Sequence, residues 1–119
     1  MGSFGSPSFW EIFMNAQIRS SEVATATGTG GGSVTATLPA ATDGQSTYVT
    51  MISGGYSATS TRRLLELKSD SNVIATFVIT NHGEVVFTSP IKLPPGTTAS
   101  VTLQSGSGNT FTNIAGYTV

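Results

Sequence analysis

His82 is the only histidine in this chain of 119 residues, and the chain has no cysteine. It stands in the run Asn81-His82-Gly83, where asparagine and glycine tolerate a positive φ, so we expect a tight turn there. A catalytic base would also need a nucleophile and an orienting carboxylate within reach. No local motif such as G-x-S-x-G accompanies His82. The sequence therefore predicts no catalytic residue, and a protein that is not an enzyme.

Metal and cofactor sites need clustered ligands or a phosphate-binding loop. One histidine and six scattered carboxylates do not give the ligand spacing of a zinc site. Asp70, in the run SDSN, resembles part of a calcium loop, but the other ligands are missing and an Asx-type turn is favoured. The run GTGGGS precedes a predicted strand, whereas a dinucleotide-binding loop follows a strand and opens a helix. We therefore expect neither a metal nor a cofactor.

Charge is sparse along the whole chain. Asp, Glu, Lys and Arg make up 9% of the residues, and the net charge is −1. Binding to nucleic acid needs clustered Lys and Arg. Here only Arg62-Arg63 form a pair, and Glu66 and Lys68 follow closely, which favours a solvated strand or a salt bridge between subunits. No run approaches the roughly 18 apolar residues of a membrane-spanning helix, and no secretory signal opens the chain. We expect neither nucleic acid nor a membrane as a partner.

The densest apolar patch is SFWEIF, close to the N-terminus, and it contains the only tryptophan. Phe9, Ile12 and Phe13 fall at helical spacing on one face, although so short a helix is marginal alone in water. Exposed aromatic residues of this kind dominate the energy of binding patches. We therefore expect Phe9, Trp10, Ile12 and Phe13 to bind a partner. The alternative is that this segment folds back and completes the core of its own chain.

The segment SEVATATGTGGG, which follows the apolar patch, has the composition of an extended, partly flexible linker. Residues 1–32 are thus predicted to form an N-terminal arm and a glycine-rich linker, and residues 33–119 a separate body. Aromatic side chains also bind sugars by stacking, so Trp10, Tyr48 and Tyr56 are candidates for a carbohydrate site. Tyr48 and Tyr56 lie in or beside predicted strands, where packing in the fold explains them equally well.

The body consists of short apolar segments separated by turn residues. Gly54-Gly55 are expected to end or to bulge the second strand, and the proline-rich residues 89–96 to form a connection. Regular short strands without a helical pattern indicate an antiparallel β-sandwich or barrel. The predicted strands are 33–38, 46–52, 62–68, 73–80, 84–88, 99–104 and 113–119. The predicted core is Leu38, Tyr48, Ile52, Leu65, Leu67, Phe77, Ile79, Phe87, Val101, Leu103, Ile114 and Tyr117.

Three stretches of the body resemble a family of small virion proteins from tailed bacteriophages. They are VTATLPAATDGQSTYVTMI, FTSPIKLPPGTTASVTL and GSGNTFTNIAGYTV, which together cover most of residues 34–119. Each motif is low in complexity and moderately specific, and residues 1–32 lie outside the resemblance. The run STRRLLELKSD departs from the family because it is more charged than the usual Gly-, Ala- and Thr-rich segment.

The resemblance implies an all-β protein, an antiparallel β-sandwich of jelly-roll type, here with an extended N-terminal arm. It implies a capsid decoration or cement protein that sits on the outer capsid surface of the virion, as a trimer. The partners would be the major capsid protein and two further copies of the chain. The family supplies no catalytic residues. A tail, neck or head-fibre component is one alternative, and a carbohydrate-binding β-sandwich module is another.

Overall fold

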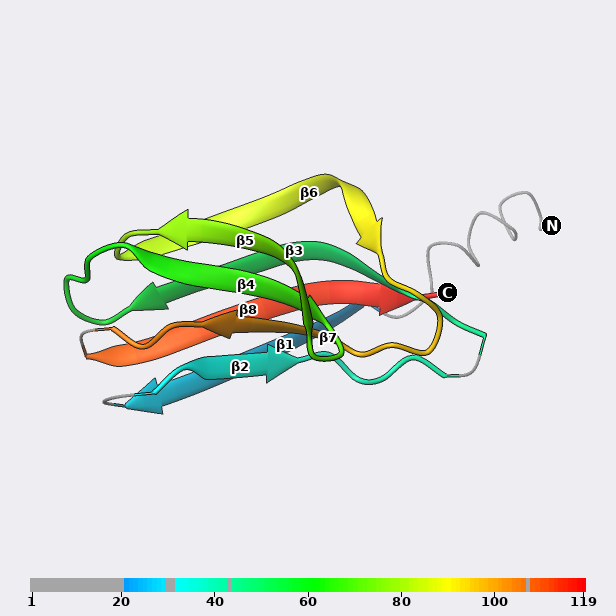
Figure 1. Ribbon diagram of the computed structural model, residues 1–119, viewed down its shortest axis with the longest axis horizontal. Helices are drawn as coiled ribbons and strands as arrows, with labels where there is room; N and C mark the ends of the chain where they lie inside the picture. Colours follow the sequence, from blue (N-terminus) through cyan, green and yellow to red (C-terminus); the bar gives the residue numbers. More distant parts are fainter. Residues whose placement is uncertain (1–20, 30–31, 43, 107) are drawn as a thin grey trace, which may run out of the picture.

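The computed structural model describes residues 21–29, 32–42, 44–106 and 108–119 (Figure 1). Every regular element within these ranges is a β-strand, and no helix occurs among them. In chain order the strands are β1 (Ser21–Thr29), β2 (Val34–Thr37), β3 (Thr47–Tyr56), β4 (Arg63–Ser69), β5 (Asn72–Ile79), β6 (His82–Lys92), β7 (Ala99–Leu103) and β8 (Asn109–Thr118).

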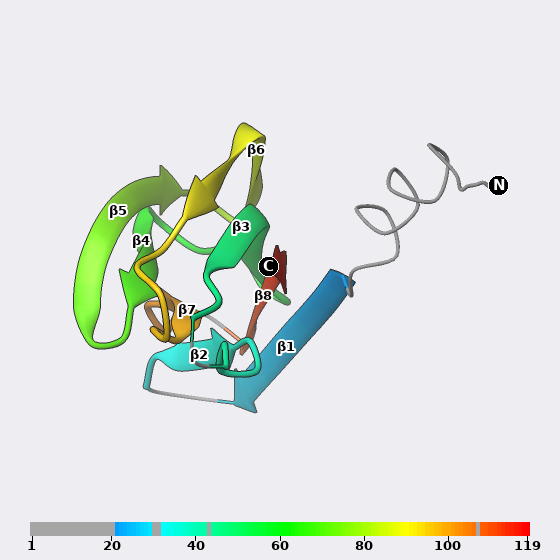
Figure 2. The same cartoon turned by 90° about the vertical axis from the view of Figure 1, so that its right-hand side faces the viewer.

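The eight strands form two antiparallel sheets of four, packed as a β-sandwich. Sheet A has the order β1-β8-β3-β6, and sheet B has the order β2-β7-β4-β5. The two layers are separated in the end-on view of Figure 2. The edge strands β1 and β2 therefore border one side of the sandwich, and β6 and β5 border the other.

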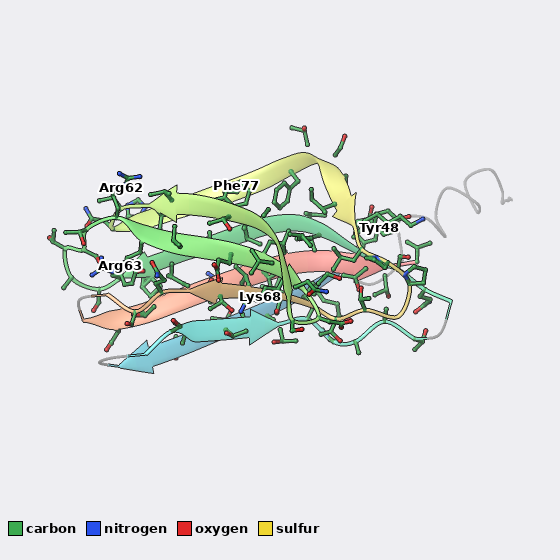
Figure 3. The ribbon with its side chains drawn as sticks, in the orientation of Figure 1. Tyr48, Arg62, Arg63, Lys68 and Phe77 are labelled. Carbon is green, nitrogen blue, oxygen red and sulfur yellow. The ribbon has the colours of Figure 1, made fainter. Side chains whose placement is uncertain are left out.

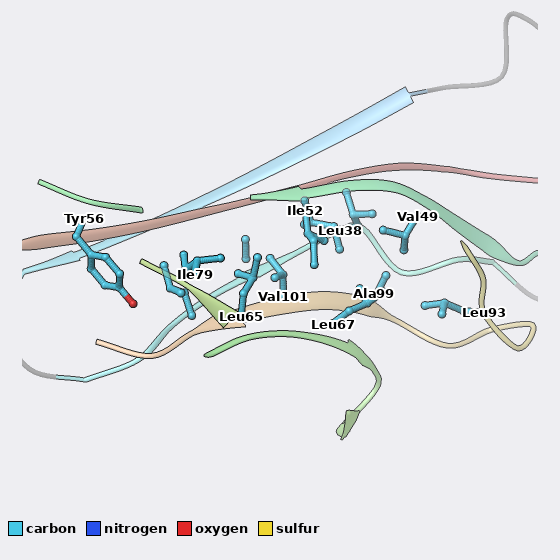
Figure 4. Close-up of a cluster of buried hydrophobic side chains, with 13 residues drawn as sticks. Leu38, Val49, Ile52, Tyr56, Leu65, Leu67, Ile79, Leu93, Ala99 and Val101 are labelled. Atoms are coloured by element: carbon cyan, nitrogen blue, oxygen red, sulfur yellow. The ribbon is translucent and has the colours of Figure 1, made fainter. Parts of the chain in front are cut away.

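The core lies between the sheets and follows from the alternation of side chains along each strand. Ile52 and Ile114 are fully buried partners on adjacent strands of sheet A, and Leu65 and Leu103 are the corresponding pair on sheet B. Figure 4 shows Ile52 and Leu65 within the cluster of buried side chains. Eight of the predicted core residues are buried as expected: Leu38, Ile52, Leu65, Leu67, Ile79, Val101, Leu103 and Ile114. The sequence prediction omitted the five other buried hydrophobic residues of the described ranges: Ala36, Val49, Tyr56, Leu93 and Ala99.

Two predicted core residues, Tyr48 and Tyr117, instead point to the outer face of sheet A. For Tyr48 the cause is a β-bulge in β3, where the register shifts between Val49 and Met51 against both neighbouring strands. The bulge inserts Thr50, so the fully buried apolar side chains of β3 are Val49 and Ile52, three residues apart, and strict alternation counted back from Ile52 assigns Tyr48 to the wrong face. Tyr117 lies three residues from the buried Ile114 in the regular alternation of β8, so its place on the outer face follows from that alternation and its inclusion in the predicted core was wrong.

Phe77 and Phe87 are only partly buried, although both pack against the core. They belong to β5 and β6, the edge strands on one side of the sandwich, where each sheet has no further strand to cover them within the described residues. β6 continues through Pro90 to Lys92, a segment expected to be a connection. Pro90 is tolerated because residues 87–90 of this edge strand have no pairing partner on β3, so its missing N–H leaves no ladder acceptor unsatisfied.

The strand β1 lies in a segment that the sequence analysis assigns to the linker. It pairs with β8 over nine consecutive residues, from Ser21 opposite Tyr117 to Thr29 opposite Asn109. Its inward side chains are the small Ala24 and Ala26, which pack against the core. A run of Ala, Thr and Gly has little hydrophobic signal, and pairing with β8 supplies the stability that the local sequence lacks.

Candidate binding face on sheet A

The outer face of sheet A carries a row of apolar side chains that crosses all four strands. Val23 of β1 lies opposite Ala115 of β8, Ala115 lies opposite Met51 of β3, and Met51 lies opposite Val86 of β6. We call these four residues the apolar row. Val23 is 68% exposed and Val86 is 63% exposed, so both ends of the row are open to solvent. Because directly opposite residues point to the same face of a sheet, the row is a continuous apolar stripe across that face.

An aromatic pair borders the apolar row. The rings of Tyr48 and Tyr117 are stacked, with centroids 5.3 Å apart and planes inclined by 7°. The Nζ of Lys92 lies 6.0 Å from the centroid of the Tyr48 ring. Tyr117, Tyr48 and Lys92 are neighbours on β8, β3 and β6, so the Tyr48 ring lies between the side chains of Tyr117 and Lys92. This arrangement leaves Tyr48 little open ring face on which a sugar could stack.

A polar row borders the apolar row on its other side. The Oγ1 of Thr25 donates to the Oδ1 of Asn113 at 2.7 Å, and the Nδ2 of Asn113 donates to the Oγ of Ser53 at 3.1 Å. Glu84 of β6 follows opposite Ser53 and is exposed. The face thus combines an apolar stripe, two tyrosines and a hydrogen-bonded amide, with few charges.

The predicted N-terminal anchors cannot be placed on this face. Phe9, Trp10, Ile12 and Phe13 lie outside the described residues. The described part of the chain that follows them begins with β1 at Ser21, directly opposite Tyr117. The N-terminal segment therefore joins the sandwich at the aromatic pair, beside the apolar row.

The residues that suggested catalytic or metal chemistry lie at turns. His82 is exposed at the start of β6, next to Asn81, whose φ is 64°. Asp70 occupies the turn between β4 and β5 with a φ of 55°, and its Oδ1 accepts a hydrogen bond from the N–H of Thr98 at 2.9 Å. Asp70 is a turn residue, as the sequence indicated, whereas His82 was expected in the turn and instead opens β6 directly after Asn81. Among the described residues, no group of three or more His, Asp or Glu side chains could hold a metal ion.

The basic residues within the described ranges do not gather into a patch. Figure 3 places Arg62 and Arg63 at one end of the sandwich and Tyr48 near the other, with Lys68 between them. The Nε of Arg63 donates to the carbonyl of Ser105 at 2.9 Å, so this guanidinium braces a loop.

Tyr56 is buried near the same end of the sandwich as Arg63. Its hydroxyl donates to the carbonyl of Gln104 at 2.5 Å. Burial raises the pKa of the Tyr56 phenol, and the charge of Arg63 offsets part of that rise. With its ring 7% exposed, Tyr56 is a core residue rather than a platform for a sugar.

A small hollow opens at the end of the sandwich beside the aromatic pair. Glu22, Leu38, Thr47 and Gly116 are among the residues that line it, and its volume is about 110 Å³. Pockets for small molecules usually measure roughly 300–1,000 Å³, whereas a water molecule occupies about 30 Å³. The hollow is therefore of a size for a few water molecules.

Comparison with known proteins adds no family assignment. No protein-family model matches the chain, and no curated protein sequence is similar to it. No helix that could cross a membrane occurs in the part of the chain that the structure describes.

The apolar row was not identified from the sequence. Val23 lies in the segment predicted to be a linker, so it was not expected in a sheet. For Met51, the bulge in β3 changes which side chains share the outer face with it. The exposed Val86 carried a signal, since both Val85 and Val86 are apolar in a strand where only Val85 faces the core.

Proposed function

We propose that this protein is a structural, non-enzymatic decoration protein that binds the outer surface of a phage capsid as a trimer and stabilises the shell. Its partner would be the major capsid protein. The proposal rests on the resemblance of the body to small virion proteins of tailed phages, and the sandwich of two four-stranded sheets agrees with it.

The strand order supports a jelly-roll type for this sandwich. Sheets of order β1-β8-β3-β6 and β2-β7-β4-β5 place the first strand beside the last and alternate most connections between the layers. Eight strands wound in this way form two Greek keys, an arrangement common in viral capsid domains but also in lectins and cupins. The strand order therefore agrees with a virion protein, and lectins and cupins share it.

The observation that carries the proposal is the apolar row on the outer face of sheet A. The row exposes Val23 and Val86 in a chain with few charges. Weakly charged surfaces with an apolar centre and a polar rim are typical of protein–protein interfaces. A shell offers a partner surface of the same kind, repeated in many copies.

The N-terminal arm would dock beside this face. We expect Phe9, Trp10, Ile12 and Phe13 to enter an apolar groove of the capsid, as helices or strands do in other peptide recognition modes. Full burial of one such side chain is worth about 1.5–3 kcal/mol, and part of this is lost because the arm must become ordered. Many copies on one shell add avidity.

The test is co-sedimentation of the purified chain with capsids that lack it. Replacing Trp10 and Phe13 together by Ser should abolish binding, while the circular dichroism of the β-sandwich stays as in the parent. A shortened chain without residues 1–20, which retains all of β1, should behave in the same way. Unchanged binding of both variants would refute docking through the arm. Unfolding of the shortened chain would show that the arm completes the core of its own chain.

Two other functions remain candidates. A tail, neck or head-fibre component would use a similar sandwich but would be present in few copies per particle, so the copy number in purified virions separates it from a decoration protein. A carbohydrate-binding module would bind glycans on an array; the covered ring of Tyr48 and the buried Tyr56 do not favour this function.

A further inference from the structure

The strand β5 is an edge strand with little protection. It pairs only with β4, so the opposite edge of its backbone has no strand partner within the described residues. Its sequence NVIATFVI contains neither a charged residue nor a proline. Natural proteins usually protect edge strands with charge, proline, a β-bulge or a cover, because a bare edge pairs with other chains. Of these, β5 has a bulge at Ile74, and the run from Ala75 to Ile79 beyond it is regularly paired and carries no charge. An edge of this composition indicates a surface that is covered in the assembled protein.

Apolar side chains surround this edge on both sides. Val73, Ile74 and Val78 are 47%, 45% and 50% exposed, and they are half of the six most exposed large apolar side chains among the described residues. On the inner side, the rings of Phe77 and Phe87 lie 6.2 Å apart and are only partly buried. The sandwich thus presents large aliphatic and aromatic groups along the side bordered by β5 and β6, which we call the β5/β6 side.

The opposite side has the complementary character. It is bordered by β1 and β2, in which seven of nine and three of four residues are Ala, Gly, Ser or Thr. The two strands contain one charged residue, Glu22. A side with large protruding side chains and a side of small residues can interlock when two copies meet head to tail. Two β5/β6 sides in contact would instead place large groups against large groups.

We propose that the β5/β6 side of one copy packs against the β1/β2 side of a second copy. A contact between two different surfaces generates a closed ring if the rotation between copies allows it. The number of three copies rests on the proposed function. The contact itself rests on the large apolar side chains of the β5/β6 side and the small residues of the β1/β2 side. β5 and β6 of each copy are then covered by a neighbour, and no copy has a bare edge.

The area available is sufficient for such a contact. The eight residues of β5 extend about 26 Å at roughly 3.3 Å per residue, and two sheets about 10 Å apart with their side chains are about 20 Å thick. Each side therefore offers about 500 Å², and one contact buries about 1,000 Å² in total, the lower limit for a specific interface. In a ring every copy makes two such contacts.

The solution mass of the full chain tests the proposal. The parent should have three times the 12.2 kDa mass of one chain in light scattering. Val78→Lys and Ile74→Lys should each be monomeric, because a lysine ammonium cannot be buried unpaired at the contact. Val119→Lys is the matched control: Val119 is also 50% exposed but lies at the end of the chain, so this variant should stay a trimer. Circular dichroism of each variant checks that the sandwich is folded.

A second variant tests the head-to-tail arrangement. Thr27→Lys, at an exposed position of β1, should also be monomeric. Mixed with Val78→Lys, it should give a species of two chains, because one intact β5/β6 side then meets one intact β1/β2 side. A monomeric parent, an oligomeric but folded Val78→Lys variant, or an oligomeric Thr27→Lys variant would each overturn the proposal. None of these measurements uses a capsid, so loss of capsid binding and loss of this contact are separate results.

Discussion

Tyr48 of β3 and Tyr117 of β8 are stacked on the outer face of sheet A, 5.3 Å apart and nearly parallel, at the point where β1 begins. An aromatic pair contributes about 0.5–1.5 kcal/mol beyond the area that it buries. A double-mutant cycle with Tyr48→Leu and Tyr117→Leu should therefore give a coupling energy of about this size in urea unfolding. Additive effects of the two replacements would show that the stacking stabilises nothing.

Gly116 marks the closest approach of β8 to its neighbours. A Cβ at this position would lie 2.4 Å from the carbonyl oxygen of Tyr48 and 3.1 Å from the Cδ1 of Leu38. The first contact is with backbone and cannot be relieved by a rotamer change, so Gly116→Ala should lower the free energy of unfolding by about 1–3 kcal/mol, as overpacking does. Gly96→Ala is the control. Gly96 has open space around it, so that variant reports only the cost of its positive φ of 77°. Equal losses for the two variants would contradict the steric explanation.

The two-sheet architecture could be predicted because the body alternates apolar and polar residues between clear turns. The exact face of each residue in β3 could not. Thr50 is accommodated as a bulge, and its hydroxyl donates to the carbonyl of Ala115 at 3.1 Å, a contact made by a residue 65 positions away. No local pattern announces such a bond. Gly54-Gly55 were expected to end or to bulge the strand, but β3 continues to Tyr56 and its bulge lies between Val49 and Met51. Gly54 instead faces Leu103 and Leu65 across the core, where a Cβ would not fit.

The candidate binding face was less predictable than the core. The prediction of a core relies on residues that are near in sequence, whereas the apolar row joins β1, β8, β3 and β6, which only the sheet order brings together. Val23 and Met51 have no common local pattern, and β1 itself depends on pairing with β8. The prediction of Phe9, Trp10, Ile12 and Phe13 as anchors stays a prediction, because these residues lie outside the described ranges.

The apolar row should matter for capsid binding but not for folding. Val86 is 63% exposed, so Val86→Lys should change the free energy of unfolding by no more than about 0.5 kcal/mol. If the face docks on the shell, burial of a lysine should weaken capsid binding at least tenfold, about 1.4 kcal/mol, in a co-sedimentation titration. Ser71→Lys adds the same charge at an exposed turn and serves as the control. Equal affinity of the two variants would exclude this face from the contact.

Asn81 holds the turn between β5 and β6 in two ways. Its φ is 64°, and its Oδ1 accepts a hydrogen bond from the N–H of Ser60 at 2.8 Å. Asn81→Ala removes the acceptor and strains the backbone, and should cost about 1–3 kcal/mol in thermal or urea unfolding. Asn81→Gly relieves the backbone but still lacks the acceptor, so it should cost less than Asn81→Ala. A larger loss for the glycine variant would show that neither contribution controls this turn.

Tyr56 should make the stability of the protein depend on alkaline pH. Burial raises the pKa of this phenol above its ordinary value of 10.0. As the pH rises through 10.0, the unfolded chain releases its Tyr56 proton while the folded chain retains it. Ionisation therefore stabilises the unfolded state, and the free energy of unfolding falls until the pH reaches the pKa of Tyr56 in the folded chain. Below pH 10.0 the phenol is protonated in both states, so Tyr56 makes its full contribution to stability.

Tyr56→Phe isolates this effect. At neutral pH the variant should be less stable by about 0.5–1.5 kcal/mol, because the bond from the Tyr56 hydroxyl to the carbonyl of Gln104 is lost. Above pH 10.0 the difference should shrink, since only the parent still loses stability through this phenol. The near-ultraviolet absorbance of phenolate gives an independent measure: the component missing in Tyr56→Phe should titrate above 10.0. A component that titrates at or below that value would contradict burial of the hydroxyl.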